Sequence, residues 1–378
     1  MIVTSVDEMT IVVLLSDISI LARKSWMTIA ESMIRAIVKA LGLIDIFGEE
    51  HMTETGKMAG YTHAREYGSH PFYFQICMHE GHWKMGVALR FSAQALAYYR
   101  VRFEELYGCI IQPYEIIQLI QKALPLYIVR LSRIDLCADY INEAVSVQTI
   151  ADNLNCGLWK IQFSDGKKNP SRISYYSKGG EISTVYIGSK VKNNVSLLRI
   201  YDKRLEQLQT HGTRFQEAAV CDSWVRFENQ IRGKYAHSIT SELMKMESPE
   251  QLETMIAACI TNKYTFIATD GTEASVTTAL KKLTPTASYE FRLPKYRDMS
   301  LTESLHFLTT HAGLLPFLYK ASLFNPNAID EFSDYLKARM STYIPNHDVT
   351  KWVKEHSDYY SVHGLEDLFE TGGKENDS

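Results

Sequence analysis

A stretch of alternating side chains between Tyr127 and Tyr140 places the strongest constraint on the fold of this chain. Successive side chains of a β-strand point to opposite faces of a sheet, so residues two apart share a face. One face of this segment has Arg133, Asp135, Cys137 and Asp139, and the other has Ile134, Leu136, Ala138 and Tyr140. The pattern predicts a strand that packs one face into a core and presents charged groups on the other.

Two later segments repeat this division into a charged and an apolar face. The segment from Leu197 to Lys203 places Arg199, Tyr201 and Lys203 on one face, with Leu198 and Ile200 on the other. The segment from Trp224 to Arg232 places Arg226, Glu228, Gln230 and Arg232 on one face. If the three strands are neighbours in one sheet, their charged faces form a single site.

Tyr201 stands between two cations of its segment, Arg199 and Lys203. A tyrosine can act as a covalent nucleophile, and a nearby positive charge favours its phenolate form. Because arginine and lysine also bind phosphate, the matching electrophile is a phosphodiester. The chain has 22 tyrosines, most of which we expect to be packing residues, so this assignment depends on the residues around Tyr201.

The three charged faces together supply carboxylates and further cations. The carboxylates are Asp135, Asp139 and Glu228, and the candidate phosphate-binding cations are Arg133, Arg199, Lys203, Arg226 and Arg232. Carboxylate oxygens suit Mg²⁺ or Mn²⁺, hard ions that can polarise a phosphate. The alternative is a solvated sheet face with cross-strand ion pairs, such as Arg133 with Glu228, each worth about 0.2–1 kcal/mol.

The charge distribution points to nucleic acid near the Tyr201 segment. The whole chain has a net charge of −4 and a pI near 6.3, which argues against indiscriminate coating of nucleic acid. Between Lys160 and Lys234, however, 14 Lys and Arg stand against 7 Asp and Glu. The aromatic residues interleaved with these cations are Trp159, Phe163, Tyr175, Tyr176, Tyr186 and Tyr201. Cations for phosphates and rings for bases are the components of a groove for single-stranded nucleic acid.

Other classes of protein are disfavoured by what the sequence lacks. No apolar run approaches the ~20 residues of a membrane span, and the amino-terminal segment has acidic residues where a signal peptide needs basic ones. We therefore expect a cytoplasmic protein without membrane contact. The six cysteines are scattered without a Cys-x-x-Cys pair, and we expect them to be reduced core residues. No Gly-x-x-x-x-Gly-Lys-Ser/Thr loop is present, so any helicase must be a separate partner.

The spacing of apolar residues changes from a period of two to a helical period after Gly233. We expect helices at 238–245, 249–262, 275–283, 301–323, 328–340 and 350–357. A first region at 1–235 is therefore followed by a mainly helical region at 236–370. The Gly-rich, charged tail at 371–378 is expected to be disordered.

Five segments in order resemble the Rep_trans or replication initiation factor family, which includes rolling-circle initiators of Gram-positive plasmids and related relaxases of integrative conjugative elements. The segments are Asp7 to Val12, Arg133 to Tyr140, Thr184 to Ser189, Leu198 to Glu206 and Trp224 to Arg232. Each motif alone is weak, but five in this order across roughly residues 5 to 240 are much more specific. The carboxy-terminal region matches weakly.

The resemblance implies an α+β fold, with a central, mainly antiparallel sheet flanked by helices and a mainly helical carboxy-terminal region. It makes Tyr201 the nicking tyrosine. The metal site that it implies contains Asp135 and Glu228, with Asp139 as a further match, and the phosphate-binding residues are Arg199, Lys203 and Arg226. One departure is Asp202, at a position where plasmid members often have Asn. This departure matters because a carboxylate next to the phenol could raise the pKa of the phenol.

The expected reaction is attack of Tyr201 on one phosphodiester at a specific origin, which leaves a 5′-phosphotyrosyl link and a free 3′-hydroxyl and allows later religation. Residues 1–235 are then a nicking and strand-transfer domain, and 236–370 a DNA-binding or dimerisation region. The expected cofactor is Mg²⁺ or Mn²⁺, and the expected partners are origin DNA, a host helicase and a second copy of the chain. The alternatives are a relaxase of a conjugative element or mobilisable plasmid, a non-catalytic DNA-binding regulator, and a metal-dependent nuclease that uses water.

Overall fold

The computed structural model consists of two compact units, Met1–Pro294 and Lys295–Ser378. The residues that it describes are 1–15, 25–52, 58–162, 173–188, 195–284, 301–310, 312–363 and 365. The tail expected to be disordered, 371–378, lies outside these residues.

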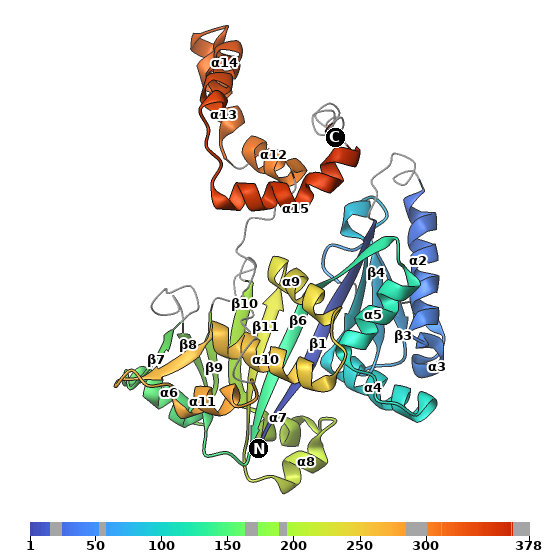
Figure 1. Cartoon of the computed structure of the whole chain (residues 1–378). Coiled ribbons are helices and arrows are strands. Elements are labelled where there is room, and N and C mark those ends of the chain that lie inside the picture. Colours follow the sequence, from blue (N-terminus) through green and yellow to red (C-terminus); the bar gives the residue numbers. More distant parts are fainter. Residues whose placement is uncertain are drawn as a thin grey trace. The chain divides into compact units, whose positions relative to one another are not determined.

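A ten-stranded sheet forms the centre of the first unit (Figure 1). Its strands are β1 (Ile2–Leu15), β2 (Glu50–Met52), β3 (His63–Tyr67), β4 (Phe74–Met78), β5 (Val87–Phe91), β6 (Tyr127–Ile141), β8 (Ile173–Lys178), β9 (Glu181–Ile187), β10 (Ser196–Asp202) and β11 (Trp224–Arg232). Their order across the sheet is β2-β3-β4-β5-β1-β6-β11-β10-β9-β8, and all neighbouring pairs are antiparallel. Two short strands, β7 (Trp159–Gln162) and β12 (Thr265–Ala268), form a separate antiparallel pair.

Helices account for most of the remaining described residues. In the first unit they are α2 (Trp26–Ala40), α3 (Leu43–Phe47), the 3-10 turn η1 (Trp83–Met85), α4 (Ala93–Tyr107), α5 (Pro113–Ala123), α6 (Val147–Asn155), α7 (Lys203–Thr210), α8 (Phe215–Val220), α9 (Lys234–Leu243), α10 (Pro249–Lys263) and α11 (Ser275–Lys281). In the second unit they are α12 (Leu301–Thr310), α13 (Leu314–Phe324), α14 (Ala328–Ser341) and α15 (His347–His363). The expected α+β fold with a helical carboxy-terminal region is confirmed.

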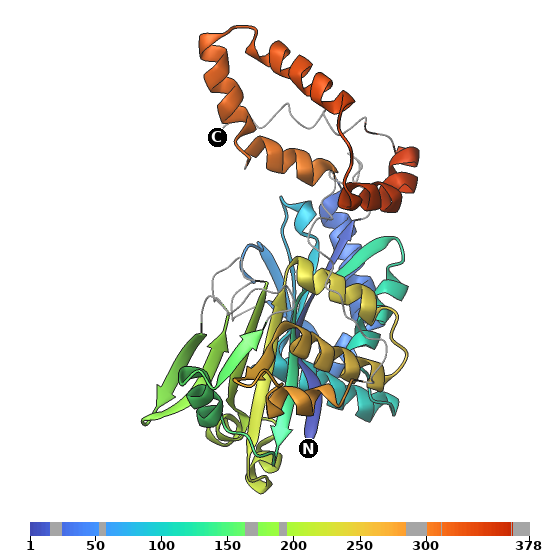
Figure 2. The ribbon, with the colours of Figure 1, turned by 60° about the vertical axis from the view of Figure 1, so that its left-hand side comes forward.

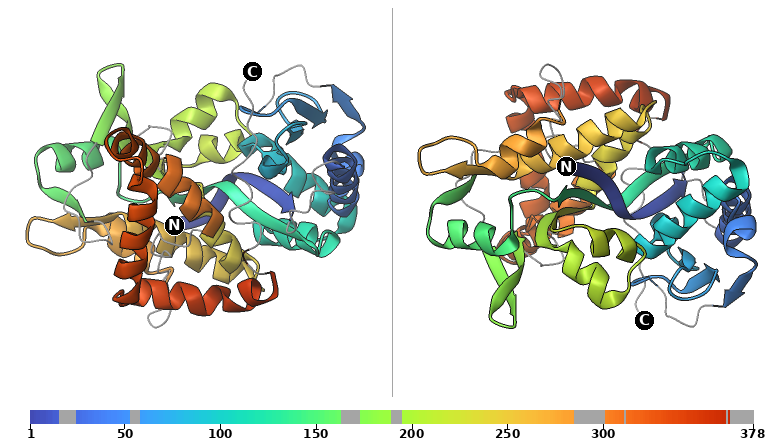
Figure 3. Two further views of the ribbon diagram at one scale, coloured as in Figure 1. Left: turned by 90° about the horizontal axis from the view of Figure 1, so that it is seen from above. Right: turned by 90° about the horizontal axis from the view of Figure 1, so that it is seen from below.

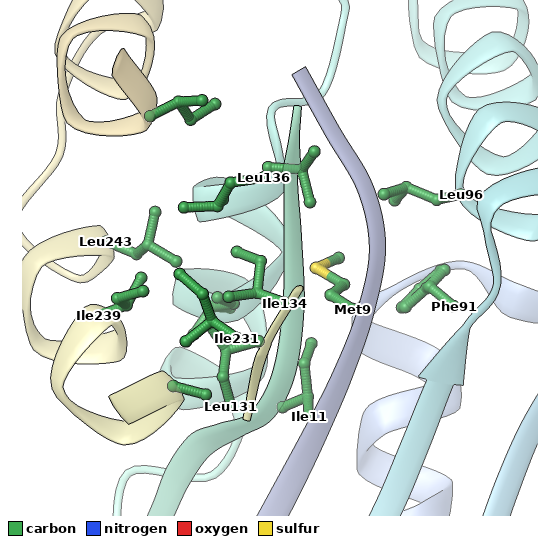
Figure 4. Packing of buried hydrophobic residues seen from close by; sticks show 14 of the residues in the cluster. Met9, Ile11, Phe91, Leu96, Leu131, Ile134, Leu136, Ile231, Ile239 and Leu243 are labelled. Carbon is green, nitrogen blue, oxygen red and sulfur yellow. The ribbon is translucent and has the colours of Figure 1, made fainter. Parts of the chain in front are cut away.

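The helices of the first unit divide between the two faces of the sheet. In both views of Figure 3, α9 and α10 (gold) lie over one face near β6 and β11, whereas α7 and α8 (yellow-green) lie on the other side. The apolar face of β6 and β11 supplies Ile134, Leu136 and Ile231 to the core, where they pack with Ile239 and Leu243 of α9 (Figure 4). Burial of each such side chain contributes about 1.5–3 kcal/mol, so this face holds the sheet to its helices.

A β-bulge interrupts β1 where it pairs with β6. Val6 pairs with Leu136 and Met9 pairs with Ile134, so two residues of β1, Asp7 and Glu8, stand opposite one residue of β6. A bulge of this kind changes the direction of side chains locally and is frequent next to active sites.

The compact unit extends beyond the region expected to end at residue 235. Helices α9 to α11 contribute buried residues to its core, including Tyr235, Leu252 and Val276. The division of function at residue 235 stays a prediction, since the compact units describe contacts and not activities.

Two helical expectations for the chain differ from the structure. The single helix expected at 301–323 is two helices, α12 and α13, and Gly313 before α13 has a left-handed φ of 76° that interrupts a helix. Helices α3, α6, α7 and α8 were not expected. Each has nine residues or fewer, which is too short for an apolar period to identify a helix in the sequence.

The cysteines and the helix lengths bear on two further expectations. None of the six cysteines, all of which lie in the described residues, forms a disulfide, but Cys109 and Cys156 are exposed, so the expectation of six core cysteines is wrong for these two. In the described parts of the chain, no helix combines the length and the apolar character that crossing a membrane requires.

Candidate active site

Strands β6, β11 and β10 are neighbours in the sheet, so the three charged faces expected from the sequence meet (Figure 1). Two rows of directly paired residues cross the three strands. One row is Asp139, Arg226 and Tyr201, and the next is Cys137, Glu228 and Arg199. Directly opposite residues point to the same face of a sheet, so these side chains share one surface, opposite the apolar face that packs on α9.

Asp139 is the centre of a group of charges that we call the closed cluster, formed by Asp7, Asp139, Arg214 and Arg226. The two oxygens of Asp139 accept hydrogen bonds from Arg226 at 2.6 and 2.8 Å, and Arg214 donates a third at 3.2 Å. The remaining terminal nitrogen of Arg226 donates to Asp7 at 2.6 Å. Asp139 is 0% exposed and Arg226 is 2% exposed. Burial opposes ionisation of Asp139, but the hydrogen bonds and charges of Arg226 and Arg214 hold its pKa below the usual value.

Tyr201 belongs to a second group, formed with Arg199, Lys203 and Glu228, which we call the tyrosine cluster. The phenol donates to Oε2 of Glu228 at 3.1 Å, and Arg199 donates to the same oxygen at 2.6 Å. The Arg199 guanidinium also covers the phenol ring, 4.3 Å from its centroid, and the Lys203 ammonium lies 5.7 Å from that centroid. Tyr201 is 6% exposed as a result, whereas the Arg199 side chain is 36% exposed and reaches solvent.

The cations Arg226 and Arg199 lower the pKa of Tyr201, as expected, but the net shift is upward. Burial raises the pKa of the phenol, and the Glu228 carboxylate raises it further, while Arg226 and Arg199 lower it by less. Burial also raises the pKa of Glu228, against the opposing charge of Arg199. A protonated phenol needs a base before it can attack a phosphate, and Glu228 already accepts its hydrogen bond.

The strand expected to continue through Lys203 ends one residue earlier, at Asp202. The Asp202 side chain accepts a hydrogen bond from the Leu205 backbone at 2.8 Å and caps α7, a position that aspartate favours. Lys203 is the first residue of that helix, and its ammonium pairs with Glu206 at 2.6 Å. The carboxylate that contacts the Tyr201 phenol is thus Glu228, whereas the Asp202 carboxylate binds the backbone of α7.

Asp135 forms a third pair on the same face, with Arg133. Arg133 donates to both oxygens of Asp135, at 2.9 and 2.5 Å, and to Glu8 at 2.7 Å. Burial raises the pKa of Asp135 even though Arg133 lowers it. The cross-strand pair of Arg133 with Glu228 that we considered is not the pair that forms, because Glu228 binds Arg199 instead.

The five expected phosphate-binding cations differ in their access to solvent. Arg226 and Lys203 are buried, at 2% and 7% exposure. Arg133 is partly exposed and has two carboxylate partners. Arg232 is exposed at the end of β11, opposite Arg133, and Arg199 is the cation nearest to the phenol ring. The structure therefore leaves Arg199 and Arg232 most accessible to a ligand.

The three expected metal ligands do not form a metal site as they are arranged. Asp135 and Asp139 accept hydrogen bonds from guanidinium groups on both oxygens, and Glu228 accepts from Arg199 and Tyr201. Within the described ranges, no group of three or more His, Cys, Asp and Glu side chains is placed to hold a metal ion. Oxygen donors of this type suit Mg²⁺ or Mn²⁺, but their arrangement does not fit either ion.

Asp7, Glu8 and Arg214 belong to this face but were not expected as site residues. Simple alternation would point Asp7 and Glu8 to opposite faces, whereas the bulge in β1 allows them to reach Arg226 and Arg133, respectively. The one sequence signal for these acids was their place in the first segment of the family resemblance. Arg214 precedes α8 in a segment without a periodic pattern, and no signal identified it.

Two comparisons with known proteins found similarity to this chain. Residues 129–307 match the Rep_trans family, described as replication initiation factor, and the match includes β6, β10 and β11. A rolling circle replication initiator protein from Geobacillus stearothermophilus has a similar solved structure, with a TM-score of 0.52 and 19% identity over 75% of this chain and 97% of that chain. At this identity the similarity shows a shared fold. No curated protein sequence matches the chain.

Proposed function

We propose that this chain, whose residues 129–307 belong to the Rep_trans replication initiation factor family, starts rolling-circle replication by nicking one DNA strand at a specific origin. The observation that carries the proposal is the hydrogen bond from the Tyr201 phenol to Glu228, beneath a partly exposed arginine. A nucleophile, a base and a phosphate-binding group are thus in contact. Family membership supports the replication function, and the chemistry at Tyr201 is our own inference.

Arg199 has a central place in the proposed binding step. Its guanidinium covers the phenol and pairs with Glu228, but more than a third of its side chain is exposed, so it can exchange these partners for a DNA phosphate. Movement of Arg199 toward the phosphate would uncover the phenol ring. The positive charge would then lie where negative charge develops on the phosphate during attack.

The proposed chemical step is a transesterification. Glu228 takes the phenol proton while the Tyr201 oxygen bonds to phosphorus and the bond from phosphorus to the 3′ oxygen breaks. The leaving oxygen takes up a proton and becomes the free 3′-hydroxyl. The 5′-phosphotyrosyl link retains the energy of the broken bond, so attack by a 3′-hydroxyl can religate the strand.

The other cations have separate proposed roles. Arg133 and Arg232, opposite each other on β6 and β11, would contact phosphates further along the strand. Lys203 would offset charge on the phenolate from its position 5.7 Å from the ring. Arg226 would act by holding β6, β11 and β1 in place, because all three of its donor nitrogens bind carboxylates.

Dependence on Mg²⁺ or Mn²⁺ remains a prediction, and no step above requires the ion. The carboxylates Asp135, Glu228 and Asp139 now bind cationic side chains, so an ion could use them only after one of the arginines leaves. Nicking assays with EDTA and with each ion would test the prediction. Measurement of Mn²⁺ affinity by electron paramagnetic resonance, with and without DNA, would give a second readout that does not depend on activity.

The proposed partners are origin DNA, a host helicase and a second copy of the chain in the cytoplasm. The region 236–370 is our candidate for DNA binding or dimerisation. In the second compact unit, many apolar side chains of the described helices are exposed, including Phe324 at 90%, Met340 at 70% and Leu323 at 63%. Such exposure supports a role for these helices in association.

Replacement of Tyr201 by Phe tests the proposal. The variant should lose all nicking of supercoiled origin DNA and all covalent DNA adduct on denaturing gels, because the attacking oxygen is absent. Origin binding should remain within about threefold of wild type, since phosphate contacts are retained. Tyr107→Phe, at an exposed tyrosine of α4, is the matched control and should nick normally.

Each other outcome of this experiment selects an alternative. Undiminished nicking by Tyr201→Phe would indicate a nuclease that uses water. Binding without nicking or adduct by the wild type, with either ion present, would indicate a DNA-binding regulator. Nicking of a transfer origin in preference to a replication origin would indicate a relaxase with the same chemistry.

A further inference from the structure

The part of the charged face beyond Tyr201 differs from the part around Asp139. In the register of the sheet, Tyr201 of β10 is paired with Thr184 of β9, and Thr184 is paired with Tyr176 of β8. The adjacent row runs from Arg199 through Tyr186 to Ser174. Because paired residues share a face, Tyr176 and Tyr186 lie on the same side of the sheet as the phenol of Tyr201.

These two rows have no carboxylate beyond β10. The four side chains of β8 and β9 in them are Ser174, Tyr176, Thr184 and Tyr186. The rows on β6 and β11, in contrast, include Asp139 and Glu228. A DNA strand at Arg199 therefore has paired, buried carboxylates on the β11 and β6 side and neutral, aromatic side chains on the β8 side.

Tyr176 is unusually accessible for a large apolar ring. It is 67% exposed, although it lies within a strand, whereas its neighbour Tyr175 points to the other face and packs against the hydrophobic core. Figure 2 shows β8 in the hairpin at one edge of the sheet (green), where it is the last strand in the order. Adjacent strands are about 4.8 Å apart, so Tyr176 lies about 10 Å from Tyr201 across the sheet.

We infer that Tyr176, with Tyr186 beside it, forms a stacking platform for the nucleobases of single-stranded DNA next to the phosphate attacked by Tyr201. The inference rests on the proposed nicking function and specifies the form of its substrate, with bases unpaired and turned toward β8. Aromatic stacking tolerates any base, so the platform supplies affinity and position without sequence specificity. Tyr186 lies close enough to Arg199 to affect its pKa, and this connects the platform to the phosphate-binding group.

Binding measurements with two probes test the platform separately from nicking. The probes are a fluorescent 12-nucleotide oligothymidylate and a 12-unit abasic strand with the same number of phosphates, and the protein is the full chain with Tyr201→Phe to prevent covalent attachment. The parent should bind oligothymidylate roughly tenfold more tightly than the abasic strand. Adding Tyr176→Ala should remove most of this difference by weakening oligothymidylate binding alone, and Tyr176→Phe should preserve it.

The matched control is Tyr107→Ala, at another exposed tyrosine. Tyr107 is on α4, a helix that packs on the apolar side of the sheet through Leu96 (Figure 4). Loss of the Tyr107 ring should therefore change neither the affinity for oligothymidylate nor the affinity for the abasic strand. Equal binding of both probes by the parent would overturn the platform, as would equal weakening of both by Tyr176→Ala. A protein that nicks origin DNA but shows either result retains the proposed function and loses only this inference. A protein that does not nick origin DNA but shows the expected binding of both probes retains this inference and loses the proposed function.

Discussion

The closed cluster and the tyrosine cluster lie on the same face of the sheet, and each pairs an arginine with a carboxylate, but they differ in access to solvent. Arg226 of the closed cluster is 2% exposed, and each of its donor nitrogens binds a carboxylate. The Arg199 side chain of the tyrosine cluster is 36% exposed, and among the described residues its Nε has no hydrogen-bond partner.

We propose that this difference separates a structural ion pair from a reactive one. Asp139 has two arginines and a lowered pKa, so it is a stable charge that joins β6, β11 and the segment before α8. Glu228 has one partly exposed arginine, a phenol and a raised pKa, which is why we propose that it exchanges a proton. Four substitution or pH experiments would break or sharpen this contrast.

Replacing Asp139 with Asn should have the largest effect on stability. The change leaves Arg226 and Arg214 with fewer charged partners in a buried site, and breaking a buried pair in this way costs about 3–5 kcal/mol. Urea denaturation at pH 7 measures the loss. Asp222→Asn, at an exposed position, is the control and should change the unfolding free energy by less than about 0.5 kcal/mol. A loss below about 1 kcal/mol for Asp139→Asn would refute the structural role of the closed cluster.

Replacing Glu228 with Gln should affect nicking far more than stability. Loss of a general base lowers rates by about 10²–10⁴-fold, and we expect a value near the lower end because water can replace the base in part. Gln keeps an oxygen that can accept the hydrogen bonds of Tyr201 and Arg199, so the unfolding free energy should change by about 1 kcal/mol or less. Single-turnover nicking and urea denaturation give the two values. A variant that is strongly destabilised but nicks normally would reverse our assignment of the two clusters.

The difference in unfolding free energy between the wild type and each of these two variants should depend on pH, in opposite directions for Asp139→Asn and Glu228→Gln. The lowered pKa of Asp139 means that its contribution is present above the unfolded value near 4 and is lost as pH falls through the folded pKa. The raised pKa of Glu228 means that its ionised form costs stability at neutral pH, and this cost disappears as pH falls through that raised value. The wild type should therefore gain stability relative to Glu228→Gln before it loses stability relative to Asp139→Asn. Denaturation curves from pH 7 down to about pH 2 would reveal the order, and the reverse order would contradict it.

Replacing Arg199 with Gln should have the smallest effect on DNA binding, and it should also slow nicking because the charge proposed to face the phosphate during attack is lost. Removal of one phosphate contact to a single strand lowers the slope of log affinity against log salt by about 0.7. Arg102→Gln on α4 is a close control, because the Arg102 side chain is 37% exposed, against 36% for Arg199. The control should leave the slope unchanged. An unchanged slope for Arg199→Gln would indicate that Arg199 stays on Glu228 when DNA binds.

Much of this site could be predicted from local patterns. Alternation identified β6 and β11 with nearly correct ends, and it placed Asp135, Asp139 and Glu228 on the correct face together with Tyr201. These predictions succeeded because a strand fixes the direction of each side chain by its position alone. The pairing of arginines with carboxylates could not be predicted in the same way, since each arginine had several carboxylates within reach.

The sequence by itself determined the composition of the face: strands with charges on one side, a tyrosine among cations, and aromatic residues in the segments before it. The tertiary structure decided three further points. A bulge in β1 brought Asp7 and Glu8 to this face, burial made the net shift of the Tyr201 pKa upward, and strand order placed Tyr176 on the face of Tyr201, two strands away. The physical reason is that register, burial and strand order depend on contacts between segments distant in the chain, which no local pattern specifies.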